Sequence, residues 1–424
     1  MNITTFKAFR SYNYRLYFAG QSVSLIGTWM QRTAVSWVIY TLTHSAFMLG
    51  VTAFATQFPS FLLSLFGGVV SDRYNRYKVM LTTQVASLIQ ATLLAVLVLS
   101  GHATAWQILS ISIILGVINA FDVPARQSLV HEMIEDKSIL HNAIALNSSM
   151  VNLASLLGPA MAGLVLQKLG AGFCFILNAA SFVAVITSLL LMKLPKHIHV
   201  VHTKKIVHEL REGFVYLQHT PAIAYVLMMI AFMSMFVLPY GTLLPIYAKV
   251  IFKGDASTFG YISSFIGLGA MGGTIFLASL KSGSNLKKIL IVNTLIFGAA
   301  LIAFSHITVF PIAMLFATIS GFGMMSQTTV VNTIIQTNSS AAMRGRMVSY
   351  FAMSFFGMMP LGSLLIGYIS QHIGVQNTIL AQGIAAIIIS LCFIPLLLKV
   401  TKKNTNEGTT EEIEEEDDEA LKVL

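Results

Sequence analysis

Long apolar runs separated by short polar stretches dominate the chain. A bilayer core about 30 Å thick is crossed by a helix of about 20 apolar residues, and twelve segments of that kind can be placed. To within a few residues they are 15–42, 46–70, 78–100, 104–124, 143–168, 171–193, 222–248, 257–280, 288–305, 308–332, 346–370 and 375–399. Because backbone polar groups in lipid must be satisfied within their own segment, each segment is predicted to be a helix. The pattern therefore predicts an all-α integral membrane protein with twelve transmembrane helices.

The longest polar interruption between predicted helices runs from Pro195 to Pro221 and contains an amphipathic run from Ile206 to Leu217. Acidic residues crowd between Glu407 and Glu419, where like charges repel and little apolar area offsets the entropy of ordering. The predicted organisation is an N-terminal six-helix bundle in 1–195, a cytoplasmic linker in 196–221, a C-terminal six-helix bundle in 222–400, and a disordered acidic cytoplasmic tail in 401–424.

The two halves resemble each other weakly in their fifth helices. The first half has Gly158, Pro159 and Gly163 there, and the second half has Met359-Pro360-Leu361-Gly362-Ser363. Paired halves with Gly/Pro-interrupted helices in matching positions are typical of transporters, whose sites lie between the halves near the membrane midplane. Close helix packing alone also explains small residues in such helices.

Charge is scarce and unevenly placed. Charged residues make up 10% of the chain, against roughly a quarter in soluble domains. If the N-terminus is cytoplasmic, every Lys and Arg falls in a predicted cytoplasmic segment except Lys168, Lys249, Lys253 and Arg32. Cytoplasmic loops of membrane proteins carry this excess, so both termini are predicted inside, in a bacterial inner membrane. The net charge of +9 then reflects topology and not nucleic-acid binding.

One face of the first predicted helix is polar. Gln21, Ser24, Thr28, Gln31 and Arg32 fall within an arc of about 100° on a helix. Charge deep in a membrane helix is costly and by default indicates a functional site, so this face is predicted to line a polar cavity. The alternative is that Arg32 reaches the outer interface with its long side chain.

Asp122 is the only acidic residue within the twelve predicted spans, and Arg126 follows one turn later. A buried carboxylate is the usual proton carrier of a coupled transporter, which makes Asp122 the candidate here. The alternative is a structural pair with Arg126, and this interpretation is favoured. Further candidates for the cavity are Asn147 and Asn152 in the fifth helix, with Tyr240 and Gln327 in the C-terminal half.

The sequence contains no recognisable enzyme or cofactor motif. Cys174 and Cys392 both fall in predicted helices, and the histidines at 197, 199, 202 and 208 match no metal-ligand spacing. Walker, dinucleotide and nucleophile motifs are missing as well. We therefore predict no enzymatic activity, no cofactor, no metal site and no direct use of ATP.

The polar loop after the second predicted helix resembles the signature of the major facilitator superfamily, commonly written G-x-x-x-D-R/K-x-G-R-R-R/K. The matching residues are Gly68, Asp72, Arg73, Arg76 and Lys78. Asn75 replaces the glycine of the signature, and Tyr77 replaces one arginine. Residues 20–31, 37–45, 121–128 and 344–349 resemble the enterobactin-exporter-like branch, which also includes macrolide-efflux-type proteins. The resemblance covers about residues 5–400.

The resemblance implies two pseudo-symmetric six-helix bundles that work by alternating access. The signature loop would be a cytoplasmic gate, with Asp72 near the N-terminus of helix eleven and stabilised by Arg346 or Arg126. Gly68 would allow helices two and eleven to approach closely. Gly158, Pro159 and Gly163 resemble the end of an antiporter motif, but the arginine usual on helix four of proton-coupled exporters is not evident within residues 116–120.

These features together predict a secondary active exporter of small amphipathic molecules, of drug or siderophore type. Its expected partners are a small-molecule substrate, the lipid bilayer and, if transport is coupled, protons; it is expected to act as a monomer. A lipid or lysophospholipid transporter is the alternative within the same class. A membrane scaffold that signals through its tail is a more distant alternative.

Overall fold

The computed structural model describes residues 4–134, 139–193, 206–281, 283–340 and 343–397, and this part of the chain is helical without strands. Eleven of its helices are long and apolar enough to cross a membrane. The twelfth predicted span is α1 (Tyr12–Thr43), which at 32 residues is long enough but more polar. Its polar residues Gln21, Ser24 and Gln31 are buried where α1 packs on α5 and α6, so lipid does not meet them. The predicted helical membrane fold is confirmed.

The N-terminal half begins with a short 3₁₀ helix, Thr4–Arg10, and α1. It continues with α2 (Ala46–Arg73), α3 (Arg76–Leu99), α4 (Ala105–Met133), α5 (Leu140–Lys168) and α6 (Ala171–Leu190). Side-chain caps fix where several of these helices start: Ser11, Ser45 and Asn75 each accept a hydrogen bond from a backbone N–H in the first turn. Such caps satisfy donors that have no partner within the helix.

The C-terminal half begins with α7 (Ile206–His219), the amphipathic run of the predicted linker, and α8 (Pro221–Phe236). The remaining helices are α10 (Ala256–Ala278), α11 (Leu286–His306), α12 (Phe310–Asn338), α13 (Arg344–Ala352), α14 (Met358–Ile373) and a final helix, Val375–Leu397. The predicted tail at 401–424 and most of the polar part of the linker lie outside the described residues.

Two membrane spans of the C-terminal half are not regular α-helices. The segment predicted as one helix over 222–248 breaks after α8 into a 3₁₀ turn (Leu238–Leu243), a short helix (Leu244–Ile246) and a π-helix (Tyr247–Ile251). Pro239 and Pro245, which lack an N–H, lie in the first turns of the two short segments after the break. The eleventh span has a π-helical segment, Met353–Gly357, between α13 and α14. In contrast, α5 continues through Pro159.

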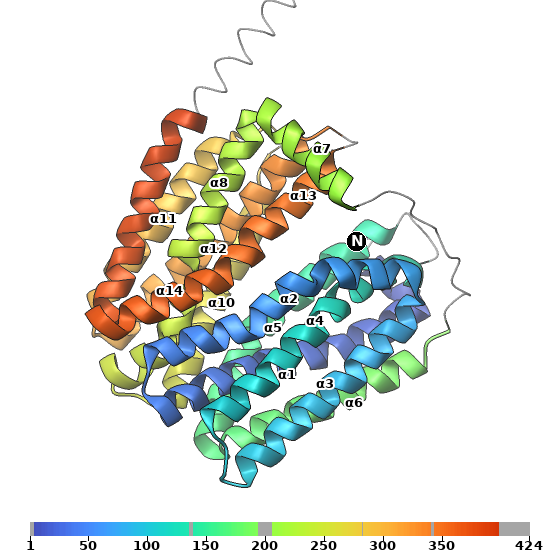
Figure 1. Ribbon diagram of the computed structural model, residues 1–424, viewed down its shortest axis with the longest axis vertical. Helices are drawn as coiled ribbons and strands as arrows, with labels where there is room; N and C mark the ends of the chain where they lie inside the picture. The colour runs from blue at the N-terminus through green and yellow to red at the C-terminus, as the bar shows by residue number, and fades with distance from the viewer. Residues whose placement is uncertain (1–3, 135–138, 194–205, 282, 341–342, 398–424) are drawn as a thin grey trace, which may run out of the picture.

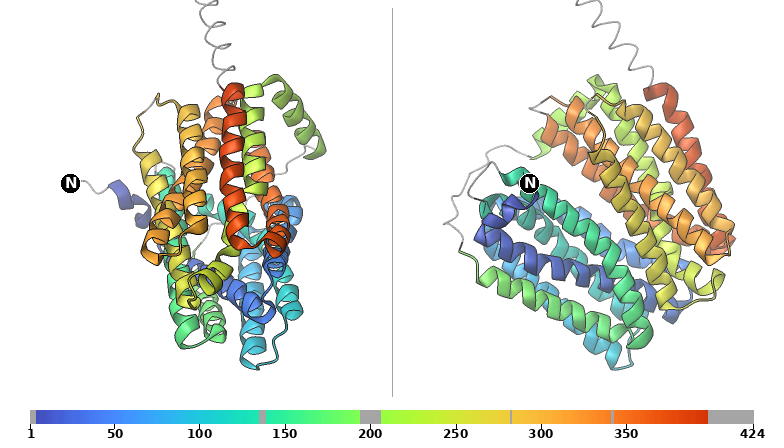
Figure 2. Two further views of the ribbon diagram at one scale, coloured as in Figure 1. Left: turned by 90° about the vertical axis from the view of Figure 1, so that its left-hand side faces the viewer. Right: turned by 180° about the vertical axis from the view of Figure 1, so that it is seen from behind.

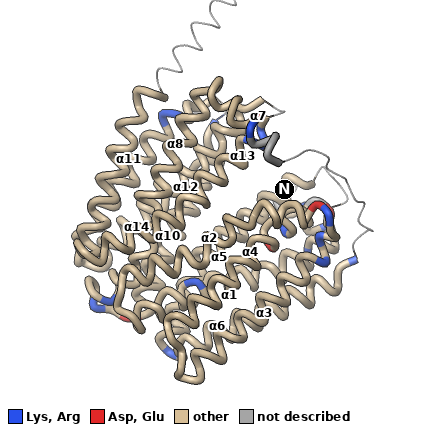
Figure 3. The backbone as a smooth tube through the Cα atoms, viewed as in Figure 1, with Lys and Arg blue, Asp and Glu red and all other residues tan. Residues whose placement is uncertain are grey.

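The helices form two bundles that lie side by side at one end and diverge toward the other (Figure 1, Figure 2). They diverge at the end that carries the N-terminus, the loop between α2 and α3, and α7. We call this the basic end, because most Lys and Arg of the predicted cytoplasmic segments belong to it, and the other the opposite end. Figure 3 shows that charged residues gather near helix ends, whereas the middle of the bundles is almost free of charge.

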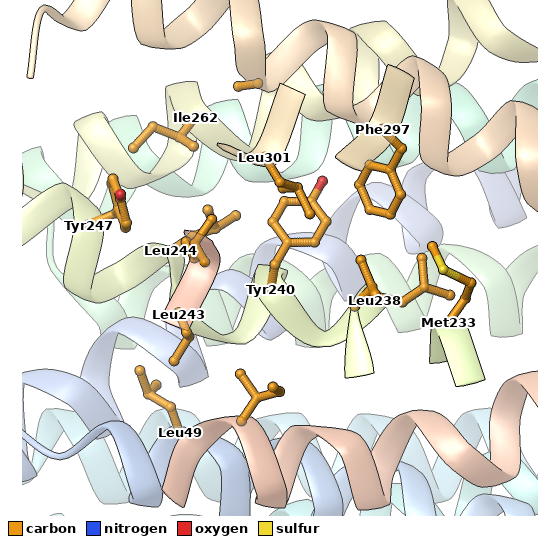
Figure 4. Close-up of a cluster of buried hydrophobic side chains, with 14 of the residues drawn as sticks. Leu49, Met233, Leu238, Tyr240, Leu243, Leu244, Tyr247, Ile262, Phe297 and Leu301 are labelled. Atoms are coloured by element: carbon orange, nitrogen blue, oxygen red, sulfur yellow. The ribbon is translucent and has the colours of Figure 1, made fainter. Parts of the chain in front are cut away.

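The hydrophobic core follows the same division. One cluster of buried residues joins both halves, and its N-terminal members, such as Met30, Leu49 and Leu166, come from parts of the helices toward the opposite end. In Figure 4 the side chains of Leu49 and Leu243, one from each half, point toward one another. A second cluster, around Tyr14 and Leu129, contains residues of the N-terminal half alone. The halves therefore share a core at the opposite end but not at the basic end.

Candidate functional site

The first contact between the halves joins α2 and α14 through facing glycines. A Cβ atom on Gly50 would lie 2.4 Å from the carbonyl oxygen of Ser363, and one on Gly367 would lie 2.8 Å from that of Ala46. Real Cβ atoms do not approach a backbone so closely, so only glycine fits at Gly50. The backbones of the two halves touch here.

Gln371 strengthens this contact from one turn further along α14. Its Oε1 accepts hydrogen bonds from the Ser45 hydroxyl at 3.0 Å and from the backbone N–H of Ala46 at 2.9 Å. The first N–H groups of a helix have no partner within the helix. A side chain of the C-terminal half therefore caps a helix of the N-terminal half.

The second contact joins α5 and α10 in the same manner. A Cβ on Gly260 would lie 2.6 Å from the carbonyl oxygen of Pro159, and one on Gly163 would lie 2.9 Å from that of Ala256. Gln167 Nε2 donates a hydrogen bond of 2.5 Å to Asp255 Oδ2, while Asp255 Oδ1 caps α10. Again a glutamine of one half contacts the N-terminus of a helix in the other.

Hydrogen bonds to Asp255 hold this cap in its ionised form. The Ser257 hydroxyl, together with the backbone N–H groups of Thr258 and Ser257, lowers the pKa of Asp255, against the opposing effect of burial. A lowered pKa favours the charged carboxylate. The stabilisation is therefore complete at neutral pH and is lost only as the pH falls through the lowered pKa.

The two contacts are copies of one pattern. In each, a glycine lies five residues after the N-cap: Gly50 after Ser45, and Gly260 after Asp255. In each, a glutamine lies four residues after the facing glycine: Gln167 after Gly163, and Gln371 after Gly367. The sequence comparison of the halves had set Gly158–Gly163 against Met359–Ser363. The structure instead matches Gly163 with Gly367, because packing partners define the equivalence.

The signature loop lies at the basic end, where the halves are apart. A Cβ on Gly68 would have no atom within 4 Å, whereas one on Gly67 would meet the Ala120 carbonyl of α4. Asp72 is 46% exposed and pairs with Arg76 at 3.6 Å. Arg76 also contacts Glu132 of α4 at 2.8 Å. Arg73 and Lys78 are exposed.

The other two predicted gate residues have partners elsewhere. Arg126 Nη2 lies 3.3 Å from Asp122 Oδ2, and Arg346 Nη1 lies 2.5 Å from Glu212 Oε2 of α7. The structure thus brings Asp72 and Arg76 together, and it does not bring either to Arg126 or Arg346. A gate formed by Asp72 at the N-terminus of α13 remains a prediction for a conformation in which the basic end is closed.

The helix α7 packs on the basic end of the C-terminal bundle. A Cβ on Gly213 would lie 2.8 Å from the Tyr350 ring, and the Tyr216 hydroxyl accepts a hydrogen bond from the Ser340 N–H at 3.3 Å. With the Arg346–Glu212 ion pair, these contacts fix the linker helix beside the start of α13. The ion pair also occupies the arginine that the predicted gate would need.

We expect Glu212→Gln to shift the protein toward closure of its basic end, since it releases Arg346. A partly exposed pair contributes about 0.2–1 kcal/mol, so the shift should be up to about fivefold. Spin labels on Tyr74→Cys and Ser349→Cys would measure it as a larger population of short distances. Arg211→Gln, an exposed change on the same helix, is the control, and an unchanged distance distribution in Glu212→Gln would contradict the expectation.

Asp122 lies inside the N-terminal bundle and is 5% exposed. Its Oδ1 accepts hydrogen bonds from the Thr83 hydroxyl at 2.9 Å and from Gln84 Nε2 at 2.7 Å, and its Oδ2 pairs with Arg126. Three donors on α3 and α4 thus surround the carboxylate. This geometry supports the structural interpretation of Asp122, while a role in proton transfer remains an untested prediction.

Replacement Asp122→Asn is accordingly expected to destabilise the fold. Removing one partner of a buried ion pair lowers the free energy of unfolding by about 3–5 kcal/mol. The loss should appear as a lower unfolding temperature of the purified protein. Thr83→Val, which removes a single neutral donor, should cost less. The pH dependence of transport should stay the same. A changed pH profile at unaltered stability would instead assign proton transfer to Asp122.

The predicted polar face of α1 is mostly buried. Gln31 forms hydrogen bonds with Gln90 of α3 and Asn178 of α6 at 3.0 and 2.8 Å. Gln21 and Ser24 are buried as well, and Thr28 is half-buried. Arg32 alone on this face is exposed, with its Cζ 5.1 Å from the centre of the Trp29 ring.

The remaining cavity candidates are not freely exposed. Asn147 accepts a hydrogen bond from the Tyr17 hydroxyl at 3.3 Å, and Asn152 is half-buried. Tyr240 is buried with its hydroxyl 3.3 Å from Ser320 Oγ, and Gln327 is fully buried. Gly158 lies against Trp29 of α1, so its lack of a side chain serves packing within the N-terminal bundle.

Sequence reasoning missed the residues that hold the halves together. Gln167, Asp255 and Gln371 are not among the predicted site residues, and Glu132 and Glu212 were not connected with any arginine. The repeated spacing of N-cap, glycine and glutamine was the signal that could have found the first three. No local pattern identifies the partners of the two glutamates, because these come from other helices.

Comparison with known proteins places these features in a family. Residues 3–422 match the family described as transmembrane secretion effector. The staphyloferrin A transporter of Staphylococcus aureus is 26% identical over 409 residues, which are 93% of this chain and 99% of that protein. The multidrug efflux pump Tap of Mycolicibacterium fortuitum is 20% identical over 89% of this chain and 93% of the pump.

A solved structure shares the fold. A bacterial homologue of the human lysosomal transporter Spinster, in an inward-facing and unoccupied conformation, matches with a TM-score of 0.70 at 14% identity. The match covers 93% of this chain and 98% of that one. At this identity the likeness concerns the fold alone.

Proposed function

This chain belongs to the transmembrane secretion effector family, an exporter-like branch of the major facilitator superfamily, and on that premise we propose how it works as a transporter. Membrane transport, and not enzymatic catalysis, is the activity of the family and of the relatives. The proposed activity is export of small amphipathic molecules of siderophore or drug type by alternating access. The similarity to the staphyloferrin A transporter over nearly its whole length favours a siderophore-type substrate.

The one-sided opening between the halves carries this proposal. At the opposite end the halves share a hydrophobic core, two glycine contacts and the hydrogen bonds of Gln167 and Gln371. At the basic end Gly68 meets no atom of the other half. In alternating access, one state of the transporter opens the space between the halves to one side of the membrane only. With the basic end in the cytoplasm, this state would load substrate from the cytoplasm of a bacterial cell, across its inner membrane.

Closure of the basic end would complete the cycle. Gly68 has room for another backbone to approach, and the half-exposed Asp72 side chain forms only a long ion pair with Arg76, at 3.6 Å. In the proposed closed state α2 meets α13 there, and Asp72 gains the helix N-terminus and Arg346 as partners. Arg346 would first leave Glu212, so α7 would act as a competitor of the gate. Each half supplies one side of every contact, so a monomer is sufficient.

Efflux from cells that lack their native exporters tests the function. The full chain should lower the accumulation of a panel of siderophores and dyes relative to cells with an empty vector, and release of iron-free siderophore into the medium should rise. A protonophore arm identifies the energy source, since proton-coupled export stops when the gradient collapses. Normal accumulation of every compound in cells with the protein in their membranes would overturn the proposal.

A further inference from the structure

The helices α3 and α11 occupy corresponding places in the two halves and begin in the same way. Asn75 caps α3 and Asn285 caps α11, and each asparagine side chain accepts a hydrogen bond from the backbone N–H of the lysine three residues later. Eight residues after these caps come Thr83 on α3 and Asn293 on α11. Thr83 and Asn293 therefore hold corresponding positions.

The helices α4 and α12 correspond in the same manner. A Cβ on Gly116 of α4 would collide with a backbone carbonyl of α2, and one on Gly321 of α12 would collide with a backbone carbonyl of α10. In both cases the carbonyl belongs to the eleventh residue of its helix. Six residues after these glycines come Asp122 and Gln327. The Thr83 hydroxyl donates to Asp122 at 2.9 Å, so the corresponding pair of the C-terminal half is expected to meet as well.

A contact between α11 and α12 places Asn293 beside Gln327. A Cβ on Gly323 of α12 would lie 2.8 Å from the Phe297 Cβ of α11. The two helices run in opposite directions, because only a short connection, residues 307–309, joins them. Asn293 precedes Phe297 by four residues and Gln327 follows Gly323 by four. Both residues therefore lie about one turn from the contact, on the same side of it.

The polar atoms of this pair have no partner within the described part of the chain. Gln327 is fully buried, and neither its Nε2 nor its Oε1 forms a hydrogen bond. Asn293 is 3% exposed, and its Nδ2 forms none either. Leaving such groups unsatisfied inside a membrane is costly. The pair therefore needs a ligand.

The N-terminal half satisfies the corresponding position with its own side chains, and the C-terminal half does not. Gln84 donates to Asp122 at 2.7 Å. The residue that corresponds to Gln84 is Thr294, and its hydroxyl donates to the Leu290 carbonyl of its own helix at 2.8 Å. Four residues after Gln327, where the N-terminal half has the ion-pairing arginine of α4, the C-terminal half has the apolar Val331. The position in the C-terminal half is therefore uncharged as well as unsatisfied.

We propose that Asn293 and Gln327 bind water in the interior of the C-terminal bundle, between α11 and α12. The two amide nitrogens donate hydrogen bonds and the Gln327 oxygen accepts them, so the ligand must both accept and donate. Water does both, whereas a metal cation binds oxygen ligands alone and an anion binds donors alone. Buried waters typically form about three hydrogen bonds with polar groups of this kind. The binding of water does not depend on which molecule the protein carries.

Hydroxyl-radical labelling of the purified full chain in nanodiscs tests for this water. A pulse of X-rays produces hydroxyl radicals from water, bound water included, and the radicals oxidise the nearest side chains, which mass spectrometry identifies. Phe297 is completely buried and lies about one turn from both amides, whereas Phe304 is 1% exposed and lies about two turns further along α11. The wild type should be oxidised at Phe297 and much less at Phe304. In the double variant Asn293→Leu/Gln327→Met, oxidation of Phe297 should fall to the level of Phe304.

Gln90→Met is the matched control. It removes a buried amide of the N-terminal half that is hydrogen-bonded to Gln31 and to the Ile111 carbonyl, and it should leave oxidation of Phe297 unchanged. Gel filtration verifies that each variant is folded. Wild-type oxidation of Phe297 no greater than that of Phe304, or oxidation that persists in a folded double variant, would each overturn the inference. The comparison of the two phenylalanines is made within the wild type, so it decides even if the double variant unfolds.

Discussion

The variant Gly50→Ala is expected to populate less of the conformation that is open at the basic end. A methyl group at this position would lie 2.4 Å from the Ser363 carbonyl oxygen and 3.3 Å from Gly367 Cα. Backbone atoms cannot move aside as a side chain can, so α2 and α14 must separate at the opposite end. Overpacking of this kind costs about 1–3 kcal/mol, which shifts a two-state equilibrium by about 5–150-fold. Export should fall because the state that loads substrate becomes rare.

Distances between spin labels at Tyr74→Cys and Ser349→Cys report on this shift. In Gly50→Ala the separation of the two halves at the basic end should decrease. Gly241→Ala is the matched control, because a Cβ there meets no atom within 4 Å although the residue also lies at the opposite end. If Gly50→Ala keeps the wild-type distance distribution, the α2–α14 contact does not hold the halves together.

The variant Asp72→Asn should nearly abolish export without destabilising the structure described here. Asp72 is half-exposed and forms one long ion pair, with Arg76 at 3.6 Å, and such pairs contribute little. In the proposed closed state the same carboxylate meets a helix N-terminus and Arg346. There its charge contributes up to about 2 kcal/mol of stabilisation. Loss of charge therefore penalises the closed state selectively, and the cycle stops with the basic end open.

Initial rates of efflux and thermal unfolding should be measured together on Asp72→Asn. We expect the rate to fall by about tenfold or more, with an unfolding temperature close to that of the wild type. Arg15→Gln offers a control for loss of one charge at the basic end, since Arg15 is exposed and lies outside the signature loop. Wild-type efflux by Asp72→Asn would contradict the gate.

The positions of the helices were predictable because they depend on local properties. Segments of sufficient apolar length form helices in lipid wherever they occur, and N-caps such as Ser45 and Asn75 mark where helices begin. The break after Val237 was missed, although Pro239 and Pro245 are visible in the sequence. Proline also occurs inside α5 without breaking it, so proline alone does not locate an interruption. The neighbouring helices decide whether the freed backbone groups find partners: Gln382 donates to the Val237 carbonyl at 3.1 Å.

The candidate site shows the limit of the sequence most clearly at two adjacent glycines. Gly67 and Gly68 are neighbours at the start of the signature. A Cβ on Gly67 would meet the carbonyl of Ala120 in α4, whereas one on Gly68 would have no atom within 4 Å. Their directions differ by about 100° on one helix. Which of the two directions faces a neighbouring helix depends on how the bundle packs. The same reasoning applies to the polar face predicted for α1, of which only Arg32 is exposed in the packed bundle.

The sequence by itself determined that this protein spans a membrane with a bundle of helices, which end of the bundle is basic, and which family it belongs to. Those properties follow from apolar length, charge placement and short motifs, all of which are local. The tertiary structure alone decided that Gln371 caps α2 of the other half and that Gln167 donates to Asp255, the cap of α10. It also decided that Arg346 pairs with Glu212 and that the two halves part at the basic end. These features depend on contacts between segments far apart in the chain, and such contacts form only once the helices pack.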